Sequence, residues 1–144
     1  MGNVLAQVSR LMRRAFDERA REIGVTRPQW QVLGVLRLHE GIRQAGLADI
    51  LEVEPITAAR MIDRMQEAGL VERRADPVDR RAWNLHLTER GSVMIERLQP
   101  LAIETSDKAL AGISEADQAQ LLATLETMRG NLTGKPAATD PLDR

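Results

Sequence analysis

The chain has no cysteine and no tyrosine, and its 144 residues include only one phenylalanine and two tryptophans. The absence of cysteine excludes disulfides, thiolate metal sites and thiol-based redox sensing. His39 and His86 are far apart in sequence, which argues against a histidine-rich metal site. We therefore expect no metal and no cofactor. An interior with so few aromatic residues must be mainly aliphatic, which favours packed helices over an aromatic-rich β-sandwich.

Long apolar runs are also absent. No segment approaches the roughly 20 consecutive apolar residues that span a bilayer. Arg10, Arg13 and Arg14 interrupt the first apolar segment, so we expect no signal peptide. These features predict a cytoplasmic protein of one domain with no membrane partner. The sequence has no nucleophile elbow, no glycine- and lysine-containing phosphate loop and no pair of histidines on a helix face, so it does not predict an enzyme.

The formal net charge is only −1, so total charge does not indicate a nucleic-acid partner. Its basic residues are nearly all arginines, which suit bidentate contacts to phosphate and guanine, although genome composition explains the same bias. An electrostatic argument therefore depends on where the arginines in the middle of the chain point. These are Arg60, Arg64, Arg73, Arg74, Arg80 and Arg81.

The segment 44–67 has the pattern of two short helices separated by a tight turn. An apolar run at 47–51 is followed by a break at 52–54, and Pro55 suits the first turn of a second helix, which Gly69 ends. One face of this second helix carries a core stripe formed by Ala58, Met61, Ile62 and Met65. The pattern is that of a helix-turn-helix, whose second helix can enter a DNA major groove.

The opposite face of the second helix carries side chains suited to DNA. Ile56 and Ala59 can contact thymine methyl groups, and Arg60 can bind a guanine edge. Thr57 and Arg64, on the flank, are better placed for phosphates. An ordinary amphipathic helix with one exposed isoleucine explains the same pattern taken alone. The DNA-binding residues expected in this helix are Pro55, Ile56, Thr57, Ala59, Arg60 and Arg64.

A β-hairpin, or wing, is expected over about 70–88. Alternation in its second strand predicts that Trp83, Leu85 and Leu87 face the core and that Asn84 and His86 face water. The loop between the strands carries two adjacent arginines, which in an isolated hairpin are usually solvated charge. Beside a groove-binding helix, Arg80 and Arg81 can instead enter a narrow minor groove. Asp63 is expected to pair with a wing arginine.

The ends of the chain carry amphipathic helices over about 3–22 and 106–132, followed by a disordered tail over 134–144. Packing these two helices on each other would leave apolar surface exposed unless a second copy covers it. We expect a homodimer, because a palindromic DNA site requires a two-fold protein. A simple intramolecular helix pair is the alternative. The fold class is mainly α with a small β-hairpin wing, a winged helix-turn-helix plus N- and C-terminal dimerisation helices.

These motifs resemble the MarR family of multiple-antibiotic-resistance-type regulators, and most closely its SlyA-like branch. The resemblance covers about 1–133, and its most specific part is the Asp79-Arg80-Arg81 wing. It implies a winged-helix homodimer that binds near-palindromic promoter DNA as a repressor and is released by a small aromatic or phenolic effector. The other matching residues are Leu47-Ala48-Asp49, Val53, Pro55, Thr57, Arg60-Met61-Ile62-Asp63-Arg64-Met65, Gly69-Leu70-Val71-Glu72-Arg73, Asp76-Pro77 and Leu85-His86-Leu87-Thr88.

Two acids depart from the family pattern. Glu52 stands where the family often has glycine in the turn, and Glu54 stands where serine or threonine commonly caps the second helix. Glutamate is less suited to this capping position. Both acids lie beside the helix end that would face DNA, where they repel phosphate unless they accept from cytosine amino groups. They therefore bear on base preference and affinity.

The family resemblance also implies an effector pocket between the dimer helices and the winged-helix lobe. An anionic aromatic ligand needs a cation and an aromatic wall, and the candidates are Arg13, Arg14, Phe16 and Trp30. Alternatively, Trp30 is a core residue and the two arginines are solvated or face DNA. A rival function for the whole chain is a winged helix that docks an acidic protein partner through Arg80 and Arg81, without specific DNA binding.

Overall fold

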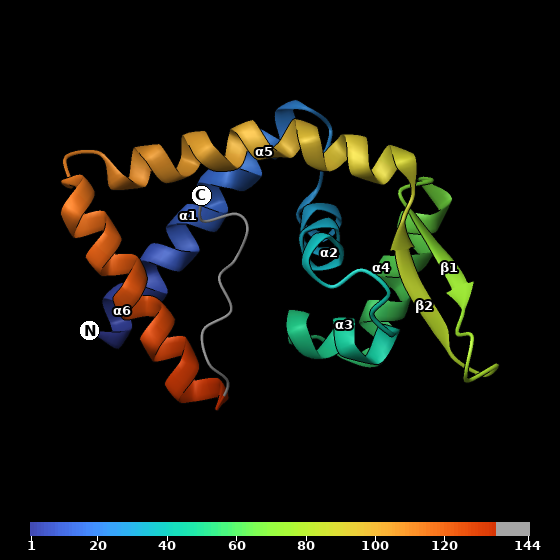
Figure 1. Ribbon diagram of the computed structural model, residues 1–144. Helices are drawn as coiled ribbons and strands as arrows, with labels where there is room; N and C mark the ends of the chain where they lie inside the picture. The colour runs from blue at the N-terminus through green and yellow to red at the C-terminus, as the bar shows by residue number, and fades with distance from the viewer. Residues whose placement is uncertain (135–144) are drawn as a thin grey trace. The chain divides into compact units, whose positions relative to one another are not determined.

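The computed structural model describes residues 1–134 (Figure 1). The tail expected over 134–144 lies, apart from Gly134 at the end of the last helix, outside the described residues. The chain divides into two compact units, one over 1–106 and one that begins at Asp107. The described elements are α1 (Gly2–Glu22), α2 (Arg27–Leu38), α3 (Gln44–Leu51), α4 (Pro55–Glu67), β1 (Val71–Ala75), β2 (Trp83–Leu87), α5 (Glu89–Leu110) and α6 (Glu115–Thr133).

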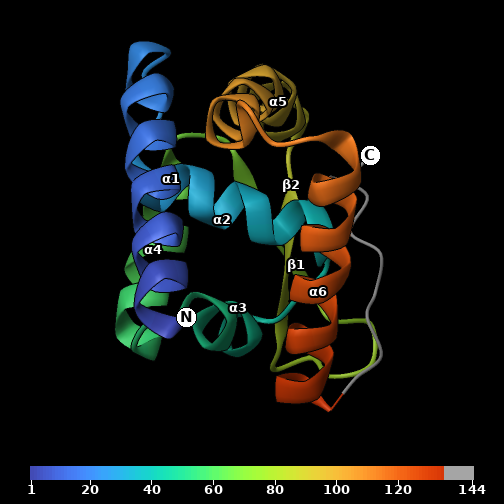
Figure 2. The same cartoon turned by 90° about the vertical axis from the view of Figure 1, so that its left-hand side faces the viewer.

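α2 forms the centre of the first unit, as its mainly apolar sequence predicts. Figure 2 shows it side-on, running between α1 and β2 with α3 below it. It begins with a capping box, in which Gln29 Oε1 accepts a hydrogen bond from the Thr26 backbone N–H at 2.9 Å. Its own fully buried Leu33 and Leu36 lie in one core with fully buried side chains from four further elements, which are Leu47, Ile62, Met65, Val71 and Leu85.

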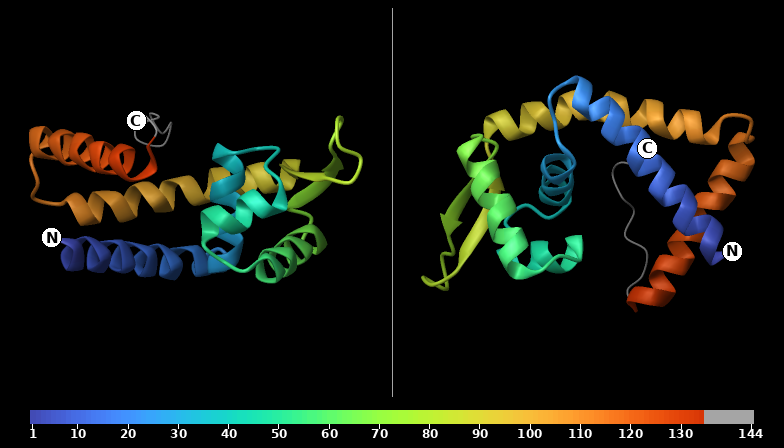
Figure 3. Two further views of the ribbon diagram at one scale, coloured as in Figure 1. Left: turned by 90° about the horizontal axis from the view of Figure 1, so that it is seen from below. Right: turned by 180° about the vertical axis from the view of Figure 1, so that it is seen from behind.

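The wing is an antiparallel pair of strands in which Val71 lies opposite Leu87 and Ala75 lies opposite Trp83. The segment before α3 pairs with the free edge of β2, because the Gly41 N–H donates to Leu85 O at 2.8 Å and the Leu85 N–H donates to Ile42 O at 2.9 Å. The loop between the two strands projects beyond α4 (Figure 3).

The strand alternation predicted from sequence is correct at Leu85, which is fully buried, and wrong at Trp83, which is 53% exposed. Trp83 lies opposite Ala75 at the loop end of the hairpin, beyond the last buried side chain of the strand. Asn84 and His86 are half-buried rather than solvent-facing. The reason is that the segment before α3 lies against β2, where His86 Nδ1 is 3.5 Å from Glu40 Oε1.

α5 starts in a tight packing arrangement against the base of the wing. Thr88 Oγ1 donates to Gly69 O at 2.6 Å and accepts from the Gly91 N–H at 3.0 Å. A Cβ atom at Gly91 would lie 2.2 Å from Leu70 O, so this position has no room for a side chain. α5 then runs through Pro100, and Glu104 of α5 is bound by Arg19 of α1 at 2.6 Å.

The second unit contains the end of α5, a turn and α6. α6 starts at the N-cap Ser114, whose side chain accepts from the Asp117 N–H at 3.2 Å. The segment 106–132, expected as one dimerisation helix, therefore comprises the last residues of α5, a turn at 111–114 and most of α6. Among residues 1–134, no helix is long and apolar enough to cross a membrane.

Candidate nucleic-acid interface

α3 and α4 form the helix-turn-helix expected over 44–67. α3 ends at Glu52, which adopts the left-handed conformation with φ 53° and ψ 43°. The following Val53 N–H donates back to Ala48 O at 3.1 Å, which closes the turn. Glu54 is the N-cap of α4 and Pro55 occupies its first turn. The Glu54 side chain makes no capping hydrogen bond. This geometry agrees with the expectation that glutamate is a poor N-cap for this helix.

α4 presents two faces, and the predicted core stripe is confirmed. Ala58, Ile62 and Met65 are buried, and Met61 is half-buried at the edge. The residues predicted to contact DNA lie on the other side of the helix. Ile56 is 61% exposed, Ala59 is half-buried, and the exposed set is completed by Pro55, Thr57, Arg60 and Arg64.

The arginines of this region divide into two groups. Arg73 on β1 is bound by Asp63 of α4 at 2.7 Å and by Gln66 at 2.6 Å, so the predicted pairing of Asp63 with a wing arginine is confirmed. Arg74 pairs with Glu72. By contrast, within residues 1–134 no acidic partner lies against the exposed guanidinium groups of Arg60, Arg64, Arg80 and Arg81.

The wing loop, residues 76–82, is ordered by its own aspartates. Asp76 Oδ1 accepts from the Val78 N–H at 2.9 Å and the Asp79 N–H at 3.0 Å, and Asp79 Oδ1 accepts from the Arg81 N–H at 3.1 Å. These backbone bonds from Asp79 and Val78, followed by a hydrogen bond from Arg43, lower the pKa of Asp76 to about 2. The loop is therefore a set of aspartate-stabilised turns that carries Arg80 and Arg81 on its surface.

Known proteins with this arrangement identify the fold. A MarR-family model matches residues 23–82. The transcriptional regulator PA3341 is 34% identical over 93% of this chain and 98% of its own, with a TM-score of 0.80. The chain belongs to the MarR family. A MarR regulator from Methanosarcina mazei Go1 is 25% identical, covering 92% of this chain and 96% of that one, with a TM-score of 0.82. A mutant MarR from E. coli complexed with operator DNA is also 25% identical, covering 88% and 91%, with a TM-score of 0.75.

The residues considered for an effector site in this MarR-family chain are only partly brought together. Phe16 and Trp30 meet edge-to-face with ring centroids 5.0 Å apart. Arg13 instead extends along α1 toward Ser9 O, 3.4 Å away, and Arg14 lies 3.4 Å from Glu18 on the same helix. The structure thus supplies an aromatic pair, while both cations lie along the surface of their own helix.

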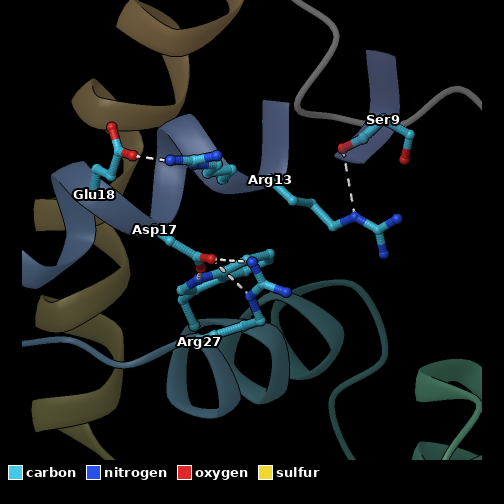
Figure 4. Close-up of polar contacts among 7 residues, drawn as sticks. Ser9, Arg13, Asp17, Glu18 and Arg27 are labelled. Atoms are coloured by element: carbon cyan, nitrogen blue, oxygen red, sulfur yellow. Dashed lines mark hydrogen bonds and ion pairs between the residues drawn. The ribbon is translucent and has the colours of Figure 1, made fainter. Parts of the chain in front are cut away.

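Sequence reasoning missed a polar cluster beside this aromatic pair. Asp17 is only 4% exposed, although it lies on a surface helix. Its carboxylate accepts from Arg27 and from Trp30 Nε1, the latter at 2.8 Å, and Figure 4 shows Asp17 and Arg27 facing each other between α1 and α2. Burial raises the pKa of Asp17, but the bonds from Arg27 and Trp30 outweigh it and leave the pKa below its usual value.

A second residue absent from the sequence-based predictions is Arg43, which precedes α3. Its guanidinium Nη2 lies 3.0 Å from Asp76 Oδ2 in the wing loop. No local pattern pairs two residues separated by 33 positions, so this contact becomes visible only in the fold. Within residues 1–134, no group of three or more histidine, aspartate and glutamate side chains is arranged to hold a metal ion.

Proposed function

We propose that this chain is a dimeric, sequence-specific DNA-binding regulator that represses near-palindromic promoter sites and is released by a small aromatic or phenolic effector. α4 would enter the major groove, and the wing loop would place Arg80 and Arg81 at the adjacent minor groove. The observation that carries the proposal is the division of the arginines. Neighbouring Arg73 and Arg74 are neutralised by acids, whereas the exposed face of α4 and the wing loop keep four exposed guanidinium groups without an acidic partner.

The residues of α4 have distinct roles in this proposal. Arg60 reads a guanine edge, while Ile56 and Ala59 contact thymine methyl groups. Pro55 starts the helix at the groove, and Thr57 and Arg64 contact phosphates. The complex of a MarR relative with operator DNA supports this use of the fold. Acting on promoter DNA would place the protein in the cytoplasm, and the proposal includes no catalytic step and no cofactor.

Dimerisation is supported by the apolar face of α1. Val4, Leu5, Val8 and Leu11 recur at helical spacing and are each more than 40% exposed in a single chain. A second copy that covers this face would also provide the two-fold symmetry that a palindromic site requires. Replacing Val8 by glutamate should therefore shift the protein toward monomer in sedimentation equilibrium. A variant that stays as dimeric as the wild type would show that this face of α1 is not part of the dimer interface.

The Phe16–Trp30 pair is the surface that we assign to the effector. A panel of aromatic carboxylates and phenols can be titrated while Trp30 fluorescence is followed in a Trp83→Phe background. Quenching that saturates, together with loss of bound DNA, supports an effector site at this pair. Saturable release of DNA with no change in Trp30 fluorescence would place the effector elsewhere.

The DNA-binding residues are tested by comparing Arg60→Ala and Arg64→Ala with a matched control. Arg97 of α5 is an exposed arginine with no ion pair to a described residue, so Arg97→Ala removes the same charge far along the chain from α4. We expect Arg60→Ala to cost about 1–3 kcal/mol in binding and to relax preference at one base pair. Arg64→Ala should weaken binding to all sequences alike. It should also lower the slope of log affinity against log salt concentration by about 1.

Equal effects of all three substitutions would show that only bulk charge matters and that α4 reads no base. The rival function makes a different prediction. If the wing docks an acidic protein, none of the three variants changes a base preference, because the folded protein has no sequence preference to lose.

A further inference from the structure

Arg43 joins the helix-turn-helix to the wing at two points. Its backbone forms an isolated β-bridge with Asn84 of β2. Its guanidinium reaches the wing loop, with Nη2 3.0 Å from Asp76 Oδ2 and Nη1 3.8 Å from Asp79 Oδ2. The Asp76 side chain is only 12% exposed, so one end of this ion pair is largely shielded from solvent. A single residue thus fixes both the edge of β2 and the loop that carries Arg80 and Arg81.

The helix that Arg43 begins does not explain why an arginine stands there. Arg43 is the N-cap of α3, and its side chain makes no capping hydrogen bond. N-caps are usually serine, threonine, aspartate or asparagine, because their side-chain oxygen accepts from a free N–H of the first turn. Arginine has only donors and cannot do this. The side chain is instead used in a contact to the wing.

A continuous series of hydrogen bonds runs from the Arg43 guanidinium to the backbone N–H of Arg81. Arg43 binds one oxygen of Asp76, and the other oxygen accepts from the Asp79 N–H at 3.0 Å. The Asp79 side chain in turn accepts from the Arg81 N–H at 3.1 Å. Because its backbone bonds and Arg43 hold the pKa of Asp76 at about 2, this carboxylate stays charged throughout the physiological range.

We infer that Arg43 is a positioning residue for the wing. It holds the wing loop at a fixed angle to the helix-turn-helix, so that Arg80 and Arg81 reach the minor groove while α4 occupies the major groove. This inference rests on the proposed DNA-binding function. It assigns to Arg43 no contact with DNA, since its guanidinium is already engaged by Asp76 and Asp79.

Two acid-to-amide variants in the hairpin separate this role from general electrostatics. Asp76→Asn keeps an oxygen for the turn but removes the charge that binds Arg43. Glu72→Gln is its control, because Glu72 pairs with Arg74 on the strand and has no contact to Arg43. Both variants remove one negative charge near DNA, so electrostatics alone predicts equal or tighter binding for both. The positioning role predicts instead that Asp76→Asn binds about five-fold more weakly.

The probes are the duplex selected from a random library and a second duplex in which A·T pairs beside each half-site are replaced by G·C. Arginines in a narrow A·T minor groove should make wild-type protein prefer the first duplex. We expect Asp76→Asn and Arg43→Ser to lose this preference, and Glu72→Gln to keep it. If Asp76→Asn matches Glu72→Gln in affinity and preference, the positioning role is wrong.

A measurement without DNA tests the same contact independently. Arg43→Ser supplies a good N-cap, so the variant should fold at least as well as the wild type. We expect its Asp76 carboxyl to titrate at higher pH in NMR and its Arg81 amide to exchange faster with solvent. If both stay as in the wild type, Arg43 does not order the wing. If they change but no duplex is ever selected from the library, the proposed function fails while the wing contact stands.

Discussion

Replacing Glu52 by glycine should stabilise the protein. Among the described residues, Glu52 is the only non-glycine residue with positive φ, at 53°. Within residues 1–134, its carboxylate accepts no hydrogen bond that would hold it in this conformation. The turn between α3 and α4 needs a left-handed residue at position 52 for the Val53 N–H to reach Ala48 O, and glycine adopts that backbone freely.

The size of the effect follows from two opposing terms. An L-residue in the left-handed region is disfavoured by roughly 1–2 kcal/mol because Cβ approaches the following carbonyl oxygen. Glycine removes this strain, but the unfolded chain then has more conformational freedom to lose, about 0.4–1 kcal/mol. We therefore expect a net increase of about 0.5–1 kcal/mol in the free energy of unfolding.

Urea denaturation followed by circular dichroism measures this difference. With a slope of roughly 2 kcal/mol per molar urea, the midpoint of Glu52→Gly should rise by about 0.3–0.5 M. Protein concentration must be equal in all samples, because unfolding of a dimer depends on it. Glu52→Ala is the control, since it removes the same charge and keeps Cβ. Equal stabilisation by alanine and glycine, or destabilisation by glycine, would refute the backbone argument.

Three further substitutions test other parts of the fold. Glu54→Asp should raise the free energy of unfolding by about 1 kcal/mol by capping α4, and Glu54→Gln should not, as urea midpoints will show. Asp17→Asn should lower the free energy of unfolding at pH 7 by roughly 2 kcal/mol, because the substitution removes a charge-assisted hydrogen bond from Arg27. Folding lowers the pKa of Asp17. The stability that the ionised carboxylate contributes is therefore present at pH values above the pKa of Asp17 in the unfolded chain, and it is lost as the pH falls through the lower pKa of the folded chain. The gap between wild type and Asp17→Asn should therefore narrow below about pH 4, and a gap that is constant with pH would contradict the assignment. Gly91→Ala should cost about 2–3 kcal/mol, because its Cβ would lie 2.2 Å from the main-chain oxygen of Leu70, and a loss under about 0.5 kcal/mol would mean that α5 can shift.

The first helix, the helix-turn-helix and the wing could be predicted from local sequence patterns. The core stripe of α4 follows from 3.6-residue periodicity, and the end of the helix follows from Gly69, which has a φ of 70°. The alternation of residues in the second strand correctly predicted that Leu85 is buried. It failed at Trp83, because alternation gives the side of the sheet and not the distance to which the core extends along it.

Apart from the Asp63–Arg73 pair, the long-range contacts around the candidate site could not be predicted. Arg43 and Asp76 are 33 residues apart, and neither lies in an apolar repeat that would mark it. Asp17 has the sequence appearance of a solvated helix residue, and its burial depends on how α1 packs on Trp30. Burial of a charged residue is decided by its partners, which one helix alone does not reveal.

In the proposed function, α4 and the wing read a palindromic duplex as parts of a dimer. The most direct test is selection of the purified full chain against a random duplex library at near-physiological salt. We predict enrichment of a palindrome whose half-sites are about one helical turn apart, and binding that weakens steeply as the salt concentration rises. A folded protein that enriches no sequence, or whose affinity is flat between low and moderate salt, would contradict it.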